Sequence, residues 1–185
     1  VPRILIEKPI ATSLRDARRV ISACDTRGVR LAVNHSLRWS PAHVRLAELT
    51  RSGLIGDIRH FSISMGSGQL CSLGSHSFDL LRFLTGAEPV KVLGYLDQTG
   101  TANPRGAQFH DPGGYGMAWF DNGMRVFFDH SEDFSTSLQL QVIGSIGRVS
   151  VAEKSRDWQV WVRGEGDREL PMPRRPRLER KEFEG

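Results

Sequence analysis

From Val90 onward the chain consists of short runs with the alternation of β-strands, and this pattern most constrains its fold. Glycine-containing turns separate the runs, and Asn122-Gly123 is a strong signal for a tight hairpin between two of them. Closely spaced strands joined by such turns favour antiparallel pairing. We expect strands over residues 90–96, 115–121, 124–130, 138–143, 148–152 and 158–162.

The first half of the chain alternates strands with helices instead. Strands are expected at 3–7, 31–34 and 58–65, and helices between Ser13 and Gly28, between Ser40 and Gly53, and over about 72–84. The order βαβαβα followed by an antiparallel run predicts an α/β or α+β fold. Its main feature is one large, mostly antiparallel open sheet covered on one side by helices.

Composition places the chain among globular proteins that do not span a membrane. Apolar residues make up 39% of it and charged residues 25%. The apolar runs are far shorter than the roughly 20 residues that a membrane-spanning helix needs. Cys24 and Cys71 have no paired spacing, so a reducing cytoplasm is the expected compartment.

The formal net charge of +4 raises the possibility of a nucleic-acid partner. Much of the excess lies in residues 174–181, where arginines are interrupted by Glu179 and are not interleaved with aromatic side chains. A stacking platform or groove-reading helix needs more than that. We therefore expect a charged, proline-rich tail over 171–185 and no nucleic-acid partner.

Two short motifs carry candidate chemistry. Glu7-Lys8-Pro9 follows the apolar run Ile4-Leu5-Ile6 at the end of a predicted strand. About seventy residues later, His76 and Asp79 lie one turn apart on one face of a predicted helix. An ammonium and an imidazole from separate elements suit alcohol–ketone redox chemistry at a nicotinamide.

Each of these residues also has a plain structural interpretation. Lys8 can be a surface lysine after a strand, and His76 a packed side chain near a helix N-terminus. Ser72 can be no more than the N-cap of that helix. The remaining candidates, His43, His60, His110 and His130, lack metal-ligand spacing, so no metal site is expected.

The order and spacing of several motifs resemble those of one family. The series comprises Ile6-Glu7-Lys8-Pro9, Asn34-x-x-x-Arg38-Trp39-x-Pro41, Ser52-Gly53-x-Ile55-Gly56-x-Ile58, Gly74-x-His76-x-x-Asp79-Leu80-Leu81-x-x-Leu84-x-Gly86 and Gly144-x-x-Gly147. Each motif alone is weak. Together, over roughly residues 4–150, they resemble the glucose–fructose oxidoreductase / inositol dehydrogenase (Gfo/Idh/MocA) family.

This resemblance implies an NAD(P)-dependent oxidoreductase that interconverts a hydroxyl and a carbonyl on a sugar, cyclitol or related polyol. It implies that residues 1–33 are a remnant of the C-terminal end of a Rossmann domain. Residues 34–170 would then be a substrate-binding and oligomerisation domain, with homo-oligomers formed through the open sheet. The cofactor would be NAD or NADP. The substrate and the choice between the two cofactors stay open.

The resemblance also implies roles for individual residues. Lys8 matches the lysine that hydrogen-bonds the reacting oxygen, in a Lys-Pro step that is often cis, and His76 matches the general acid/base. The expected substrate-binding residues are Asp79, Ser72 and Arg38. The expected cofactor-binding residues are Glu7, Lys8, Pro9, Arg38 and Trp39. One departure matters: the family commonly has aspartate four residues before the histidine, where this chain has Ser72. A hydroxyl cannot hold an imidazolium by charge.

The dinucleotide fingerprint Gly-x-Gly-x-x-Gly, set between a strand and a helix, is not found in the sequence. We therefore expect the chain to be a fragment that carries part of an active site. The alternative is a non-catalytic binding or oligomerisation module derived from the same family.

Overall fold

The structure is a computed structural model that describes residues 1–66, 68–98, 102–152, 158–167 and 178–181. Its elements, in chain order, are β1 (Arg3–Glu7), α1 (Leu14–Thr26), β2 (Arg30–Asn34), the 3-10 helix η1 (Ser36–Trp39), α2 (Pro41–Arg51), β3 (Ile58–Ser64), α3 (Gly74–Thr85), β4 (Pro89–Leu96), β5 (Gly114–Phe120), β6 (Arg125–Asp129), β7 (Gln139–Gly144), β8 (Gly147–Ala152), β9 (Gln159–Arg163), the 3-10 helix η2 (Glu165–Asp167) and β10 (Leu178–Lys181).

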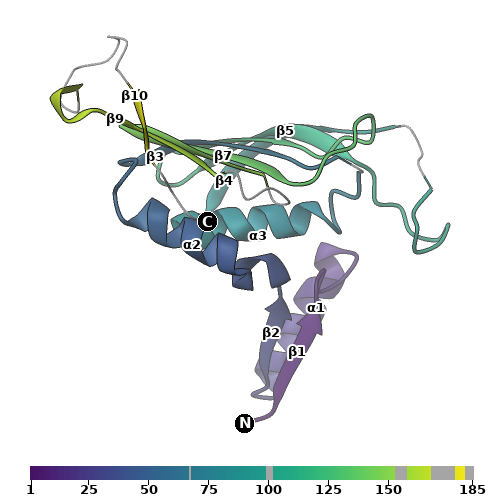
Figure 1. The fold of residues 1–185 in the computed structure, drawn as a ribbon. Coiled ribbons are helices and arrows are strands. Elements are labelled where there is room, and N and C mark those ends of the chain that lie inside the picture. The colour runs from purple at the N-terminus through teal and green to yellow at the C-terminus, as the bar shows by residue number, and fades with distance from the viewer. Residues whose placement is uncertain (67, 99–101, 153–157, 168–177, 182–185) are drawn as a thin grey trace.

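A large sheet forms one layer, and α2 and α3 pack against one of its faces (Figure 1). Its eight described strands follow the order β10-β9-β8-β7-β3-β6-β5-β4. β3 and β6 pair in parallel, whereas the other neighbouring strands pair antiparallel. The predicted fold class, a mostly antiparallel sheet with helices on one side, is confirmed.

The core lies between this sheet and the two helices. Alternate residues of β3 and β6 point toward the helices and are buried, among them Phe61, Ile63 and Val126. Leu46 of α2 and Leu81 of α3 face them and are fully buried. Apolar residues alternate along the strands and recur at helical spacing in α2 and α3. The apolar faces of the sheet and of the helices therefore meet in one interface.

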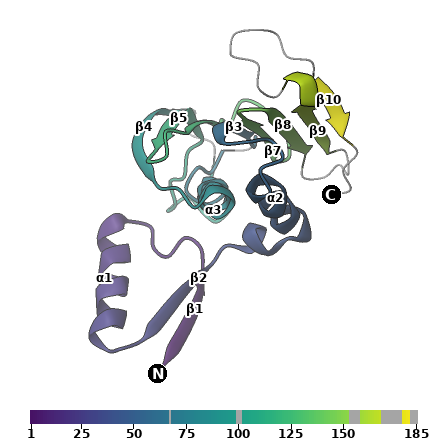
Figure 2. The same cartoon turned by 90° about the vertical axis from the view of Figure 1, so that its left-hand side faces the viewer.

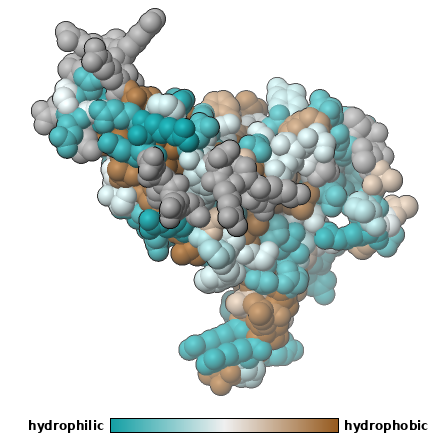
Figure 3. Space-filling view, viewed as in Figure 1, coloured by the Kyte–Doolittle hydropathy of each residue, from teal (hydrophilic) through white to brown (hydrophobic). Residues whose placement is uncertain are grey.

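β1 and β2 form a separate parallel pair, with α1 packed beside them. Both ribbon views place this unit on the far side of α2 and α3 from the large sheet (Figure 2). Its surface is apolar in places, as the lower part of Figure 3 shows. Leu5 is 73% exposed and Leu14 is 77% exposed. These side chains leave the unit with apolar surface that no described residue covers.

Local signals place the helix starts correctly. The Ser13 hydroxyl accepts a hydrogen bond from the backbone N–H of Asp16, and the Ser40 hydroxyl accepts one from that of His43. Both are N-cap interactions that satisfy amides left free at a helix start. The third helix differs, because α3 begins at Gly74 after Leu73, which makes no side-chain cap. The N-cap interpretation of Ser72 is therefore wrong.

The hairpin predicted at Asn122-Gly123 is confirmed, with β5 and β6 antiparallel on either side of it. Gly123 has φ +80°, which glycine adopts without a Cβ penalty. The range expected as a charged tail contains an edge strand, β10, which pairs antiparallel with β9. Three of its four residues, Glu179, Arg180 and Lys181, are charged, which suits a sheet edge. The rest of 171–185 lies outside the described residues.

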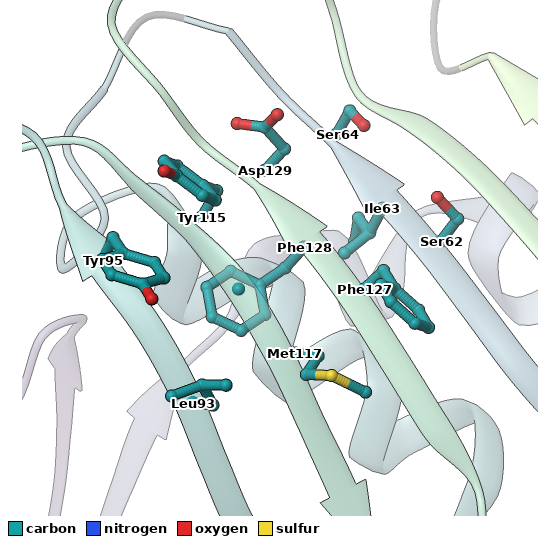
Figure 4. Close-up of a pocket in the computed structure, with 11 residues that line it drawn as sticks. Ser62, Ile63, Ser64, Leu93, Tyr95, Tyr115, Met117, Phe127, Phe128 and Asp129 are labelled. Atoms are coloured by element: carbon teal, nitrogen blue, oxygen red, sulfur yellow. The ribbon is translucent and has the colours of Figure 1, made fainter.

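The face of the sheet turned away from the helices carries a hollow of about 440 Å³ lined by side chains of β3, β4, β5 and β6 (Figure 4). Tyr95 and Tyr115 stack there with ring centroids 5.5 Å apart. Leu93, Tyr95 and Phe127 are 55%, 62% and 43% exposed. Large apolar side chains thus lie open on this outer face.

Candidate active site

The C-terminal ends of β1 and β2 lie side by side, because the two strands are parallel and Glu7 pairs in register with Asn34. The Asn34 amide donates a hydrogen bond of 2.7 Å to the Glu7 carboxylate and ties these ends together. Lys8 and Pro9 leave the end of β1, and His35 and η1 leave the end of β2. The C-terminal end of the small sheet therefore presents both segments toward α3.

Lys8 joins this edge to the segment that precedes α3. Its ammonium donates a hydrogen bond to the backbone carbonyl of Ser72. The Lys8–Pro9 peptide bond is cis, as the sequence resemblance implied. Burial lowers the pKa of Lys8, and the nearby Arg105 guanidinium lowers it further. The ammonium of Lys8 is therefore half-buried and is held at the segment that leads into α3.

His76 lies in the first turn of α3, close to Lys8. Burial lowers the pKa of His76, and the ammonium of Lys8 and the His35 ring add to this effect. The His35 and His76 rings meet edge to face with centroids 5.8 Å apart. The Nδ1 atom of His76 is buried, and no described residue donates to it or accepts from it. The imidazole is thus biased toward its neutral form, as a general base requires.

Arg38 and Asp79 form an ion pair. The Arg38 guanidinium donates Nε and Nη2 hydrogen bonds of 3.0 and 2.6 Å to the two carboxylate oxygens of Asp79. The Asp79 side chain is 11% exposed. This bidentate contact fixes η1 against α3. Trp39, the next residue of η1, is 69% exposed and offers its ring to the surrounding solvent.

A cavity of about 660 Å³ opens beside Lys8 and Pro9. Its other walls come from Cys71, Ser72 and the loop that joins β4 to β5, where Arg105 and Asp111 lie. The Asp111 carboxylate accepts hydrogen bonds from the backbone N–H groups of Cys71 and Ser72, at 2.7 and 2.9 Å. The loop is thereby fastened to the segment before α3. A volume of this size suits a small polar ligand.

The structure brings only some of the residues that the sequence singled out into the lining of this cavity. Lys8, Pro9 and Ser72 line the cavity. His76 lies near Lys8 but is not part of the described lining, and neither are the remaining predicted residues Glu7, Arg38, Trp39 and Asp79. The Asp79 carboxylate is directed to Arg38. Their roles stay predictions.

Sequence reasoning missed His35, Arg105 and Asp111. His35 follows the end of β2 directly, and that position was the available signal. Arg105 and Asp111 lie in the aperiodic stretch 97–114, which we expected only to be a loop. Loops held by a rigid scaffold often carry function, so the polar residues of this long connection were candidates for a ligand site. Their pairing with Ser72 could not be read from spacing.

Among the described residues, no group of three or more His, Cys, Asp or Glu side chains is placed to hold a metal ion. No helix within the described ranges is long and apolar enough to cross a membrane.

Comparison with known proteins addresses the family directly. Residues 62–150 match the model of the GFO/IDH/MocA C-terminal domain. These residues run from β3 to β8 and include the segment before α3, so they hold the sheet and His76. Nearly half of the chain thus matches a domain of the Gfo/Idh/MocA family. The resemblance inferred from its motifs is confirmed.

Two relatives of this chain are, by name, a dehydrogenase and a reductase. It is 34% identical to D-apiose dehydrogenase of Paraburkholderia graminis over 44% of the chain and 26% of that enzyme. It is 26% identical to 1,5-anhydro-D-fructose reductase of Ensifer adhaerens over 91% of the chain and 56% of that enzyme. The chain therefore spans little more than half of the Ensifer adhaerens reductase and about a quarter of the D-apiose dehydrogenase.

A solved oxidoreductase from Agrobacterium radiobacter, in complex with NAD+, L-tartaric acid and magnesium, has the same fold. The two superpose with a TM-score of 0.70 at 21% identity, over 90% of this chain and 52% of that one. This likeness establishes the fold.

Proposed function

We propose that the protein containing this chain is an NAD(P)-dependent oxidoreductase that interconverts a hydroxyl and a carbonyl on a sugar, cyclitol or related polyol. The observation that carries the proposal is the position of Lys8 beside His76. The ammonium comes from the end of β1 and the imidazole from the first turn of α3, and the former helps lower the pKa of the latter.

In the oxidative direction, the substrate hydroxyl loses a proton to the neutral imidazole of His76. Lys8 donates a hydrogen bond to the same oxygen and stabilises the negative charge that develops on it. The bound nicotinamide would accept the hydride from the carbinol carbon. The lowered pKa of His76 keeps it able to accept the proton at neutral pH.

The residues near the ends of β1 and β2 suit the nicotinamide end of a dinucleotide. We propose that Glu7, Lys8 and Pro9 border it on one side and Arg38 and Trp39 on the other. The exposed Trp39 ring gives it a flat apolar partner, and the Asp79 carboxylate holds the Arg38 guanidinium in place. We assign Ser72, Arg38 and Asp79 to substrate contact or its support.

We further propose that residues 1–33 form the edge of the nucleotide-binding domain and residues 34–170 the substrate domain. Leu5 and Leu14 support this division, because their exposed apolar surface would be covered by further strands and helices of such a domain. On the substrate domain, the exposed Leu93, Tyr95 and Phe127 of the outer sheet face would meet a second copy of the chain.

The activity is tested with the full-length protein, NAD+ or NADP+, and a panel of sugars, cyclitols and polyols, by following nicotinamide absorbance. Lys8→Met is expected to lower turnover by about 10²- to 10³-fold. Lys91→Met is the matched control, since its ammonium lies over the Trp119 ring on the sheet, and it should leave turnover unchanged. A folded protein without turnover on any substrate would favour the non-catalytic alternative.

A further inference from the structure

The cavity beside Lys8 holds two cationic groups that no described carboxylate pairs with. Lys8 and Arg105 both line it, and neither makes an ion pair within the described part of the chain. The carboxylate in the described lining, Asp111, has both oxygens engaged by backbone N–H groups. Its charge still acts on Lys8, but two cations against one carboxylate leave the described lining with a net positive charge.

Both cations are anchored to one residue. Lys8 binds the carbonyl oxygen of Ser72, and Arg105 donates from Nη1 to the Ser72 hydroxyl at 2.7 Å. Ser72 is 2% exposed, so it gives the two groups a fixed point. An ammonium has three N–H donors and a guanidinium five, so each cation keeps donors for a ligand.

The two cations also act on each other. The charge of Arg105 contributes to the lowered pKa of Lys8, second to burial. Two like charges around one cavity disfavour each other until an anion lies beside them. An anionic ligand therefore gains from both groups, whereas a neutral polyol leaves the repulsion in place.

We propose that this cavity selects substrates that carry a carboxylate, which the guanidinium of Arg105 binds through two parallel N–H···O hydrogen bonds. The substrate class is then the sugar acids, such as uronates. The inference rests on the proposed function, in which Lys8 donates a hydrogen bond to the reacting oxygen and therefore does not bind the carboxylate. A carboxylate, with one negative charge, can be bound by Arg105 alone. A phosphate dianion would bind Lys8 as well and take it from the reacting oxygen.

Equilibrium binding to the full-length protein tests the inference without any need for turnover. The probes are D-glucuronate, D-glucose and D-glucose 6-phosphate, compared by calorimetry at low ionic strength. We expect glucuronate to bind at least about tenfold more tightly than glucose. Equal, weaker or undetectable binding of glucuronate would overturn the proposal, and so would tightest binding of the phosphate.

Variants identify the group responsible. Arg105→Gln should remove the preference for glucuronate over glucose. Arg105→Lys should retain part of that preference, because the charge stays but the planar pair of N–H donors is lost. Ser72→Asp should also remove it by placing a carboxylate next to the guanidinium. Arg125→Gln, on the outer sheet face, is the control and should change nothing. An unchanged preference in Arg105→Gln would overturn the assignment.

The two levels of the proposal fail separately. Turnover on neutral polyols without carboxylate preference would end this inference and leave the proposed function intact. Charge-selective binding that depends on Arg105, without hydride transfer to any nicotinamide, would do the reverse.

Discussion

Lys8 donates a hydrogen bond to the backbone carbonyl of Ser72, a residue 64 positions away in the chain. This contact joins the end of β1 to the segment that starts α3. Ser75 donates its hydroxyl to the same carbonyl, at 3.2 Å. A lysine after a strand and a histidine on a helix thereby become neighbours, which is the basis of the predictions below.

The effect of Lys8 on His76 can be measured without catalysis. Because the ammonium helps lower the pKa of His76, Lys8→Met should raise that pKa toward the ordinary value of 6.5. An NMR titration of the His76 ring in both proteins reports it. Lys91→Met should leave the titration where it was, and an unshifted His76 in Lys8→Met would show that the two groups do not interact.

The lowered pKa of His76 also sets the pH dependence of turnover. The neutral imidazole persists to lower pH than in a free histidine, so kcat/KM for hydroxyl oxidation should stay level above about pH 6.5 and fall only below it. A pH–rate profile checks this. A fall that begins well above neutrality would contradict the assignment of His76 as the base.

Asp79 should matter for stability as well as for the site. Asp79→Asn breaks the bidentate pair with Arg38 and leaves a half-buried guanidinium poorly paired, at a cost of about 1–3 kcal/mol in the free energy of unfolding. Asp57→Asn removes a more exposed pair with Arg59 and should cost less than about 1 kcal/mol. Chemical denaturation compares the two; equal costs would contradict this account.

His130 should make the fold sensitive to acid. It is fully buried, and burial lowers its pKa below 6.5. The unfolded chain therefore binds a proton near that pH when the folded one does not, so stability falls as pH drops below about 6.5. In His130→Leu, unfolding measured against pH should show a weaker acid dependence. The same dependence in both proteins would exclude His130 as a source.

Gly144 explains part of the Gly144-x-x-Gly147 motif. A Cβ at Gly144 would lie 2.0 Å from the carbonyl oxygen of Ile55, and backbone atoms cannot yield easily. Gly144→Ala should therefore destabilise the protein by about 1–3 kcal/mol or more. Gly166→Ala is the control, since nothing lies within 4 Å of its Cβ position. Thermal unfolding midpoints that match in both variants would contradict the packing argument.

The sequence indicated the fold well because its signals are local. Hydrophobic alternation located the strands of the large sheet, Asn122-Gly123 located a hairpin, and the N-caps Ser13 and Ser40 located helix starts. Strand β10 was missed because Leu178-Glu179-Arg180-Lys181 is short, mostly charged and without hydrophobic alternation.

The candidate site could be predicted only in part. Lys8 and His76 were recognisable because each stands at the end of a periodic element. Arg105 was not recognisable, because its hydrogen bond to Ser72 forms only when the part of the loop before β5 that holds Arg105 and Asp111 packs against the segment before α3. The ion pair of Arg38 with Asp79 was likewise not foreseen, although both residues were named.

The most direct test of the account is the turnover of His76→Gln in the full-length protein, with the unfolding midpoint measured on the same preparation. The variant keeps a polar side chain in the first turn of α3 but cannot accept the substrate proton. We expect turnover to fall by about 10²- to 10⁴-fold while the unfolding midpoint stays close to that of the unchanged protein. Turnover within about twofold of the unchanged protein would contradict it.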